Sequence, residues 1–199
     1  MPKIGMREVR RKQVIEAAER CLMAKGFLHM SVKDIAAEAH VSTGIIYHYF
    51  KNKEDLLLQV IRESFRKSHE RVMQTVEPLS GFEEKLLKHI ENINAVPKDN
   101  PEFYTVLLNY LGQSKSDPEI NRIIASFFKN LRAYVEFYLQ KGIAENGVDL
   151  VKARHLPAIL IGLGMGLGIQ WTIDPVSFNV EEMEESFKMF FRSYLSSMR

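Results

Sequence analysis

The sequence contains almost none of the residues that build disulfide frameworks or metal centres. Cys21 is the only cysteine among 199 residues, which excludes an intramolecular disulfide and any cysteine-rich zinc site. The six histidines do not pair with one another at metal-ligand spacing. We therefore expect no metal and no cofactor.

Signals for export and for membrane insertion are also lacking. The first thirteen residues are basic, but no apolar stretch with a cleavage site follows them. Residues 156–173 are apolar, yet Pro157 and Gln170 cut this stretch below the ~20 residues that a bilayer requires. The sequence thus predicts a cytoplasmic protein without a membrane partner.

The chain lacks the residue patterns of common catalytic sites. It has no Ser/His/Asp order, no phosphate-cradling glycine loop and no paired carboxylates that demand an enzyme. The four glutamates within residues 181–185 lie where a helix is expected to begin, and the helix dipole favours solvated acidic side chains there. We expect no catalytic residues, with a helical enzyme kept as one alternative.

Apolar residues recur at helical spacing, and no long stretch alternates apolar with polar residues. The prediction is an all-α fold of about nine helices. Gly26 is expected to end the first helix in the left-handed conformation. The expected helices cover Met6–Lys25, Val32–Ala39, Thr43–Phe50, Asp55–Val76, Phe82–Ala95, Pro101–Ser114, Pro118–Glu145, Leu150–Ile173 and Asn179–Met198.

Positive charge is concentrated at the amino-terminal end. Residues 1–53 contain 10 Lys and Arg against 5 Asp and Glu, whereas residues 54–199 contain 17 against 20. Such an asymmetry favours a polyanionic partner for the first segment. We expect two domains that meet at this boundary.

Two short helices joined by a tight turn are predicted within the basic segment. Ser31 with Asp34 signals the start of the first, and Ser42 signals the start of the second, which carries Ile45 and Ile46 toward the core. After a longer bracing helix, this pair predicts a helix-turn-helix, whose second helix enters the DNA major groove. The outward positions of that helix are Thr43, Gly44, Tyr47 and His48.

Residues 41–57, VSTGIIYHYFKNKEDLL, resemble the DNA-binding signature of the tetracycline-repressor (TetR) family. The likeness extends upstream through Gly26-Phe27, Ser31-Val32 and Ile35-Ala36. It implies that Ser31, Lys53 and an aromatic ring late in the second short helix contact phosphates. The full set of implied DNA contacts is Ser31, Ser42, Thr43, Gly44, Tyr47, His48, Tyr49 and Lys53.

The segment also departs from the family pattern. Members commonly carry an aromatic residue followed by histidine where this chain has His48-Tyr49, so either ring is a candidate for the phosphate contact. Members frequently have glycine where this chain has His40, and histidine tolerates a left-handed backbone at a cost on the order of 1 kcal/mol. The opening MPKIGM with Arg10-Arg11 is similar to a BetI-like subgroup, but no ligand is carried over, because the carboxy-terminal half shares little of this likeness.

The resemblance further implies an effector cavity and a homodimer. Aromatic rings with phenolic hydroxyls suit an apolar or cationic small molecule, although ordinary core packing is the alternative for each ring. The aromatic residues on helices that surround the family's cavity are Phe103, Tyr104, Tyr110, Phe127, Phe128, Tyr134 and Trp171. The last two helices form the family's dimer interface, for which the candidates are Gly162, Gly166, Met183, Phe187, Phe190 and Tyr194.

Together these features predict a sequence-specific DNA-binding regulator, a repressor that a small-molecule effector releases from a palindromic operator. Residues 1–53 would form the DNA-binding domain, and residues 54–199 the effector-binding and dimerisation domain. The predicted partners are double-stranded operator DNA, an effector of unknown identity and a second copy of the chain. A ligand-independent DNA-organising protein is the other alternative, and effector-driven release from a specific operator would separate the two.

Overall fold

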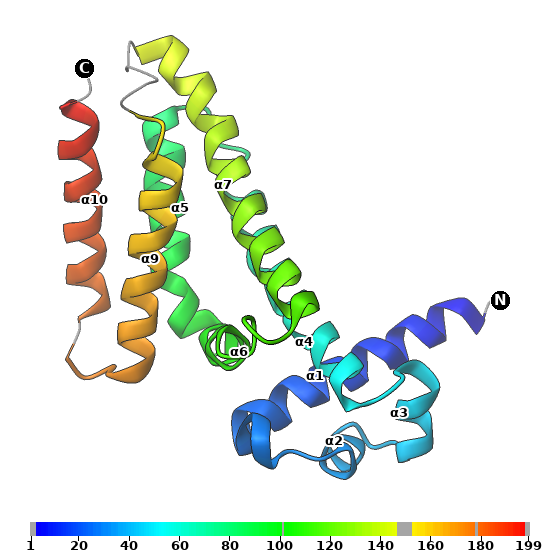
Figure 1. The fold of residues 1–199 in the computed structure, drawn as a ribbon. Coiled ribbons are helices and arrows are strands. Elements are labelled where there is room, and N and C mark those ends of the chain that lie inside the picture. The colour runs from blue at the N-terminus through cyan, green and yellow to red at the C-terminus, as the bar shows by residue number, and fades with distance from the viewer. Residues whose placement is uncertain (1–2, 101, 147–152, 178, 198–199) are drawn as a thin grey trace. The chain divides into compact units, whose positions relative to one another are not determined.

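The structure is a computed structural model that describes residues 3–100, 102–146, 153–177 and 179–197, in which all regular structure is helical (Figure 1). The all-α prediction is therefore confirmed. The helices of the described residues are α1 (Lys3–His29), α2 (Val32–Glu38), α3 (Thr43–Tyr49), α4 (Lys53–Val76), α5 (Phe82–Asp99), α6 (Glu102–Leu111), α7 (Pro118–Asn146), α9 (Leu156–Ile173) and α10 (Val180–Ser196).

The first three helices share a small apolar core. Val14 and Leu22 of α1 are fully buried, as is Ile35 of α2, and Ile46 of α3 is 1% exposed. Helix α2 packs against both α1 and α3. Burying such aliphatic side chains stabilises the arrangement by roughly 1.5–3 kcal/mol each, which makes these three short segments one unit.

Local signals place the turn between α2 and α3. The Ser31 side chain accepts a hydrogen bond from the Asp34 backbone N–H, and the Asp34 carboxylate accepts one from the Ser31 N–H, which completes a capping box. The Ser42 hydroxyl oxygen accepts from the Ile45 N–H at 3.3 Å. Between the two caps, His40 has φ 53°, so the predicted left-handed conformation is confirmed.

Gly26 adopts the predicted positive φ, at 73°, and interrupts the helical backbone as expected, so that α1 consists of two helical segments that meet in a kink at this residue. Its ψ of 165° bends the helix, which then continues to His29. A side chain at residue 26 would meet nothing within 4 Å, so the backbone conformation is the reason for glycine at this position.

Packing divides the chain into two compact units. The first contains Met1–Arg66 and Thr105–Ile123, and the second contains Lys67–Tyr104 and Ile124–Arg199. Within the first unit, the Tyr110 hydroxyl donates to the Leu57 carbonyl oxygen and thereby ties α6 to α4. The boundary between the two packing units lies inside α4. The predicted domain boundary at residue 53 rests on charge and on the DNA-binding motif, and it stays a prediction about function.

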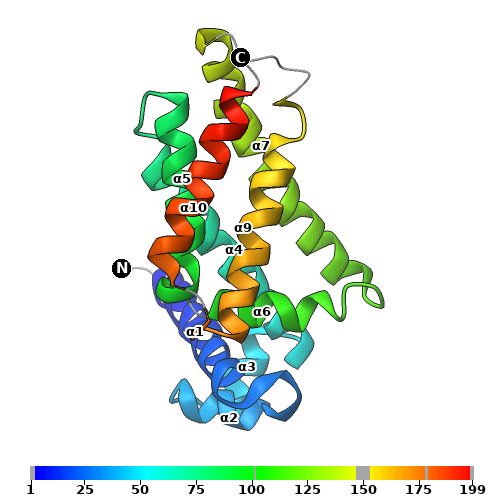
Figure 2. The same cartoon turned by 90° about the vertical axis from the view of Figure 1, so that its left-hand side faces the viewer.

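In the second unit, α5, α9 and α10 lie side by side (Figures 1 and 2). Two glycines of α9 allow the close approach. A Cβ atom at Gly164 would lie 3.1 Å from Ile93 Cδ1, and one at Gly168 would lie 2.7 Å from Tyr104 Cε2. Helix α9 is also the one helix in the described part of the chain whose length and composition would allow a membrane span, with a third of that stretch buried. The packing of α9 against α5 also explains why its residues are mostly apolar.

Several helix ends differ from the prediction, and outside α1 three of them differ by three or more residues. Helix α5 runs to Asp99 rather than Ala95 and includes Pro97 in its last turn, where proline removes one helical hydrogen bond. Helix α6 ends at Leu111 rather than Ser114, since i→i+3 turns replace the helical bonds after it. Helix α9 begins at Leu156 rather than residue 150, with Pro157 in its first turn, while residues 150–152 lie outside the described ones.

Candidate nucleic-acid interface and ligand cavity

Helix α3 presents one exposed face. Tyr47 is 55% exposed, Gly44 and His48 are exposed, and Thr43 is half-buried at the start of the helix. Residues one turn apart lie on the same side of a helix, so these four side chains share a face opposite the buried Ile46. The structure therefore brings the predicted outward positions together.

Gly44 has no role in the packing of the protein itself. A Cβ atom there would meet only the Ser42 hydroxyl oxygen, at an ordinary contact distance of 3.7 Å. Its φ is not in the left-handed region either, because the positive-φ residues in the described chain are His40 and Gly26. The small size of residue 44 therefore suits the approach of something outside the chain.

The prediction for Ile45 was wrong. Its side chain is 37% exposed, whereas Ile46 is buried. Ile45 lies about 100° around the helix axis from Ile46, and in α3 this places it at the exposed edge. Ile45 adds an apolar edge to the exposed surface.

Ser31 and Lys53 lie together at the start of α2. The Lys53 ammonium donates to the carbonyl oxygen of Met30, the neighbour of Ser31, at 2.6 Å. Ser31 is exposed, and its hydroxyl donates to Asp34 at 2.7 Å. Hydrogen bonds from Lys25 and Ser31 hold the pKa of Asp34 well below its usual range. Both predicted phosphate contacts are thus next to one helix amino terminus, where backbone N–H groups favour anions.

The two rings that compete for the phosphate contact differ in exposure. His48 is exposed and Tyr49 is half-buried, with the ring centroids 5.1 Å apart in an edge-on arrangement. The Phe50 ring beneath them is buried under the Arg11 guanidinium, 5.5 Å from its centroid. Sequence reasoning missed the exposed Lys33 and Lys51, whose charge in the basic segment was their only signal.

A cavity opens within the second unit, between α4, α5, α6, α7 and α9. It contains about 460 Å³ of space between atoms, its open mouth included. Its wall is mostly apolar, with a few polar groups, as is usual for small-molecule sites. The lining residues are Ser68, Arg71, Val72, His89, Asn92, Ile93, Val96, Phe103, Tyr104, Phe127, Leu131, Ile161 and Met165.

Three of the seven predicted aromatic residues line this cavity: Phe103, Tyr104 and Phe127. Tyr110 belongs to the first unit, where its hydroxyl is bound to Leu57. The half-buried rings of Phe128, Tyr134 and Trp171 are not among the lining residues. Tyr134 instead packs edge-on against Tyr138, with centroids 5.7 Å apart, in a cluster behind the wall.

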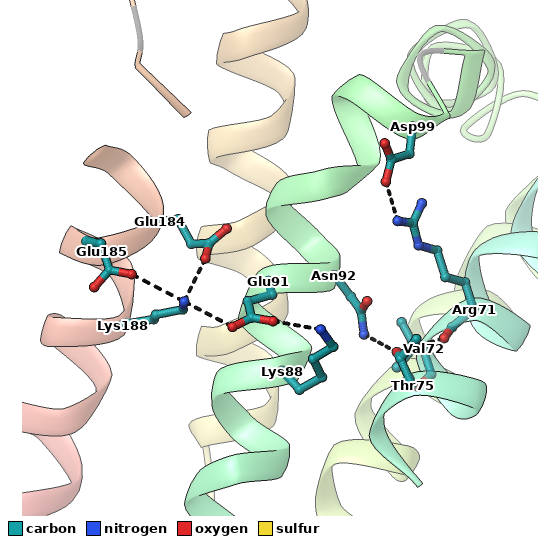
Figure 3. A network of polar contacts seen from close by, with 10 residues as sticks. All are labelled: Arg71, Val72, Thr75, Lys88, Glu91, Asn92, Asp99, Glu184, Glu185 and Lys188. Atoms are coloured by element: carbon teal, nitrogen blue, oxygen red, sulfur yellow. Dashed lines mark hydrogen bonds and ion pairs between the residues drawn. The ribbon is translucent and has the colours of Figure 1, made fainter. Parts of the chain in front are cut away.

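The polar groups of the cavity wall are held by neighbouring side chains. His89 Nδ1 lies 3.1 Å from the Tyr138 hydroxyl, and burial, with a smaller effect of His69, lowers the pKa of His89 to about 4. Asn92 donates to the Thr75 hydroxyl oxygen at 2.6 Å, as Figure 3 shows. These buried polar residues interrupt the apolar face of α5, and that interruption was the signal by which sequence reasoning could have found them.

The predicted interface residues differ in their access to a partner. Gly162 is exposed and Gly166 is half-buried, and a Cβ atom at either would meet nothing within 4 Å. On α10, Phe190 is 48% exposed and its ring stacks on that of Tyr194, with an interplanar angle of 8°. Met183 and Tyr194 are half-buried, whereas Phe187 is 5% exposed and packs against Phe191 inside the protomer.

Comparison with known families covers both parts of the chain. Residues 14–60 match the model of bacterial regulatory proteins of the tetR family, and residues 82–196 match that of the BetI-type transcriptional repressor carboxy-terminal domain. The second match alone spans more than half of the sequence. The chain therefore belongs to the TetR family of DNA-binding transcriptional regulators and has a carboxy-terminal domain of the BetI type.

Individual relatives agree with this assignment. The HTH-type transcriptional regulator BetI of Agrobacterium fabrum is 29% identical over 84% of this chain and 85% of its own length. A Saccharomonospora viridis regulator, solved in complex with choline, superposes with a TM-score of 0.82 at 22% identity, covering 92% of this chain and 95% of that one. Bacillus subtilis FadR, solved with stearoyl-CoA, gives 0.70 at 23% identity, covering 94% and 99%. Both structures share the fold.

Proposed function

We propose that this regulator is a repressor that binds a palindromic operator through α3 and leaves it when a small molecule occupies the cavity. The observation that supports DNA binding is the exposed face of α3, where neither packing nor backbone conformation requires a glycine at residue 44. A backbone without a side chain lets base edges approach closely, and the half-buried Thr43 and the exposed Tyr47 lie beside it on the same face. Ser42, with its hydroxyl engaged in the cap, would hold the start of this helix against the DNA backbone.

One of the proposed phosphate contacts would be made by residues around the start of α2. Ser31 and Lys53 would bind one phosphate, for which Lys53 would exchange the Met30 carbonyl oxygen for a charged acceptor. Either His48 or Tyr49 would bind another, and the greater exposure of His48 favours it. Such contacts fix the position of the protein on DNA and strengthen binding to every sequence.

The palindrome follows from a proposed homodimer formed through α9 and α10. The outward glycines Gly162 and Gly166 leave room for a second helix at close distance, and the stacked pair Phe190 and Tyr194 supplies apolar area beside them. Met183 would extend this surface, and Phe187 would support it from inside the protomer. A two-fold dimer places two α3 helices on half-sites related by the same symmetry.

Ligand control is proposed to act through α4. This helix begins with Lys53 and later contributes Ser68, Arg71 and Val72 to the cavity wall. A ligand that fits only one position of α4 would therefore change the separation of the two α3 helices. For about hundredfold release, it must favour the non-binding state by roughly 3 kcal/mol. Two regulators of this fold were solved in complex with choline and with stearoyl-CoA, which are ligands of different chemistry.

The cellular setting follows from the same proposal. A repressor of bacterial type meets its operator in the cytoplasm, where we place this protein. Its family consists of transcriptional regulators, and we propose no catalytic activity for it.

Selection of random DNA duplexes with the full-length protein tests this function. We expect a palindromic consensus with half-sites roughly one helical turn apart or somewhat more, bound by a dimer or a pair of dimers. Asymmetric single half-sites would contradict the dimer, and absence of any consensus would favour the DNA-organising alternative. A metabolite screen for release of the selected duplex then tests ligand control.

A further inference from the structure

One side chain with a full charge, a guanidinium, lies on the wall of the cavity. Arg71 is the only lining residue with a full charge, since no Asp or Glu is among the described residues that line it. His89 is neutral at neutral pH because burial lowers its pKa to about 4. A cationic ligand in the cavity would thus lie against the Arg71 guanidinium with no lining carboxylate to bind it. An anionic ligand could bind that guanidinium.

Arg71 is bound in a way that a ligand can replace. Its Nη2 atom pairs with the Asp99 carboxylate at the end of α5, as Figure 3 shows. The two side chains are 38% and 46% exposed, and an ion pair this exposed to water contributes little stability. Asp99 itself does not line the cavity. A carboxylate that enters from the cavity side would therefore compete with Asp99 for the planar fork of the guanidinium.

Asn92 and Thr75 fix the position of the polar wall next to Arg71. The Thr75 hydroxyl donates to the Arg71 carbonyl oxygen at 2.9 Å and accepts from the Asn92 amide at 2.6 Å (Figure 3). This chain of hydrogen bonds links α4 to α5 and holds Asn92, which is 5% exposed, at the wall. The polar groups therefore gather on the α4 and α5 side.

The remainder of the wall is apolar. Its aromatic part is already packed, since the Phe103 ring lies edge-on to Tyr104 with centroids 5.2 Å apart and tilts against Phe127 at 5.8 Å. Leu131, Ile161 and Met165 continue this surface from α7 and α9. Such a wall suits a hydrocarbon body.

We propose that the cavity binds an amphipathic carboxylate whose head group takes the place of Asp99 on Arg71 and whose hydrocarbon part lies against α7 and α9. Binding would separate the end of α5 from α4. Only the role of this ligand in operator release rests on the proposed function, because binding of the carboxylate can be measured without DNA. It differs from the sequence-based expectation of an apolar or cationic effector, which stays a prediction.

Matched probes that differ only in the head group test the charge preference. Full-length protein is titrated by calorimetry with straight-chain carboxylates from butanoate to decanoate, with the alcohols of equal length and with the corresponding alkyltrimethylammonium ions. We expect at least one carboxylate to bind about tenfold or more tightly than its matched ammonium ion and alcohol. An ammonium ion that binds as tightly as its matched carboxylate, or no carboxylate binding in the series, would overturn the proposal.

Two variants act in opposite directions and therefore locate the head group. R71Q should weaken carboxylate binding about tenfold and leave alcohol binding unchanged, whereas D99N should strengthen carboxylate binding by up to about fivefold because the competitor is removed. The control K129Q removes an exposed charge on another helix, α7, and should change neither carboxylate binding nor alcohol binding. Weaker carboxylate binding in D99N would overturn the proposal even if R71Q failed to fold.

Operator release separates this inference from the proposed function. Release by an ammonium ion but by no carboxylate would overturn the carboxylate site and leave the repressor intact. Tight carboxylate binding without release of the selected operator would contradict ligand control and leave the site intact.

Discussion

Gly168 provides a test of how the cavity wall is built. A methyl group at this position would lie 2.7 Å from Tyr104 Cε2 and closer still to the Cζ and hydroxyl oxygen of the same ring. Tyr104 is 1% exposed, so its ring has no free space on the protein side and would be pushed toward the cavity. The substitution Gly168→Ala should therefore affect both stability and ligand binding.

The expected change in the free energy of unfolding caused by Gly168→Ala is the difference between two opposing effects. Overpacking costs about 1–3 kcal/mol, and the better helix propensity of alanine returns up to about 1 kcal/mol. The free energy of unfolding should fall by about 1–2 kcal/mol, which corresponds to a lower Tm by roughly 2–4 °C per kcal/mol in a protein of this size. Urea unfolding followed by circular dichroism measures the first quantity, and thermal unfolding the second.

A second substitution makes the test specific. In a Tyr104→Leu background the overlapping ring atoms are gone, and Gly168→Ala should then be neutral or stabilising. Equal destabilisation in both backgrounds, or none in the wild type, would refute the close approach of α9 to the Tyr104 ring.

The remaining predictions concern DNA, assembly and pH. Lys53→Ala should weaken binding to all duplexes and lower the salt slope by roughly one unit, whereas Lys129→Ala should not; equal slopes would count against the phosphate contact. Gly166→Ala should raise the dimer dissociation constant in analytical ultracentrifugation, and an unchanged constant would remove this residue from the interface. Because the pKa of His89 is lowered to about 4, the unfolded chain binds more protons between pH 4 and the usual pKa near 6.5. Stability should therefore rise with pH across this window, by on the order of 3 kcal/mol, and His89→Gln should flatten the rise. If urea unfolding of the wild-type protein gives the same free energy of unfolding across this pH window, the neutral buried imidazole is contradicted.

Features that depend on a few neighbouring residues were predictable from the sequence. The capping box at Ser31, the cap at Ser42 and the left-handed His40 between them each depend on residues close by in the sequence, and the structure has all three. The exposed face of α3 follows from the same local frame. The error at Ile45 came from assigning two adjacent residues of α3 to the buried side, whereas the structure buries Ile46 and leaves Ile45 at the exposed edge.

The cavity was less predictable because distant segments form it. Aromatic content located Phe103 and Phe127, but it equally suggested Tyr110, whose hydroxyl is bound to α4 in the other unit. The polar groups that decide the ligand's charge, Arg71 and Asn92, depend on how α4 packs against α5. No local pattern contains that information, and only the assembled helices show that the wall carries a guanidinium without a lining carboxylate.

The most direct test of DNA binding through α3 is the operator affinity of Gly44→Leu. A Cβ atom at residue 44 would meet only Ser42 Oγ, at 3.7 Å, and residue 44 is exposed, so the free energy of unfolding should change by less than about 0.5 kcal/mol. If base edges approach this backbone, fluorescence anisotropy with the selected operator should show affinity reduced by at least about tenfold. Wild-type operator affinity in the folded Gly44→Leu protein would contradict the account.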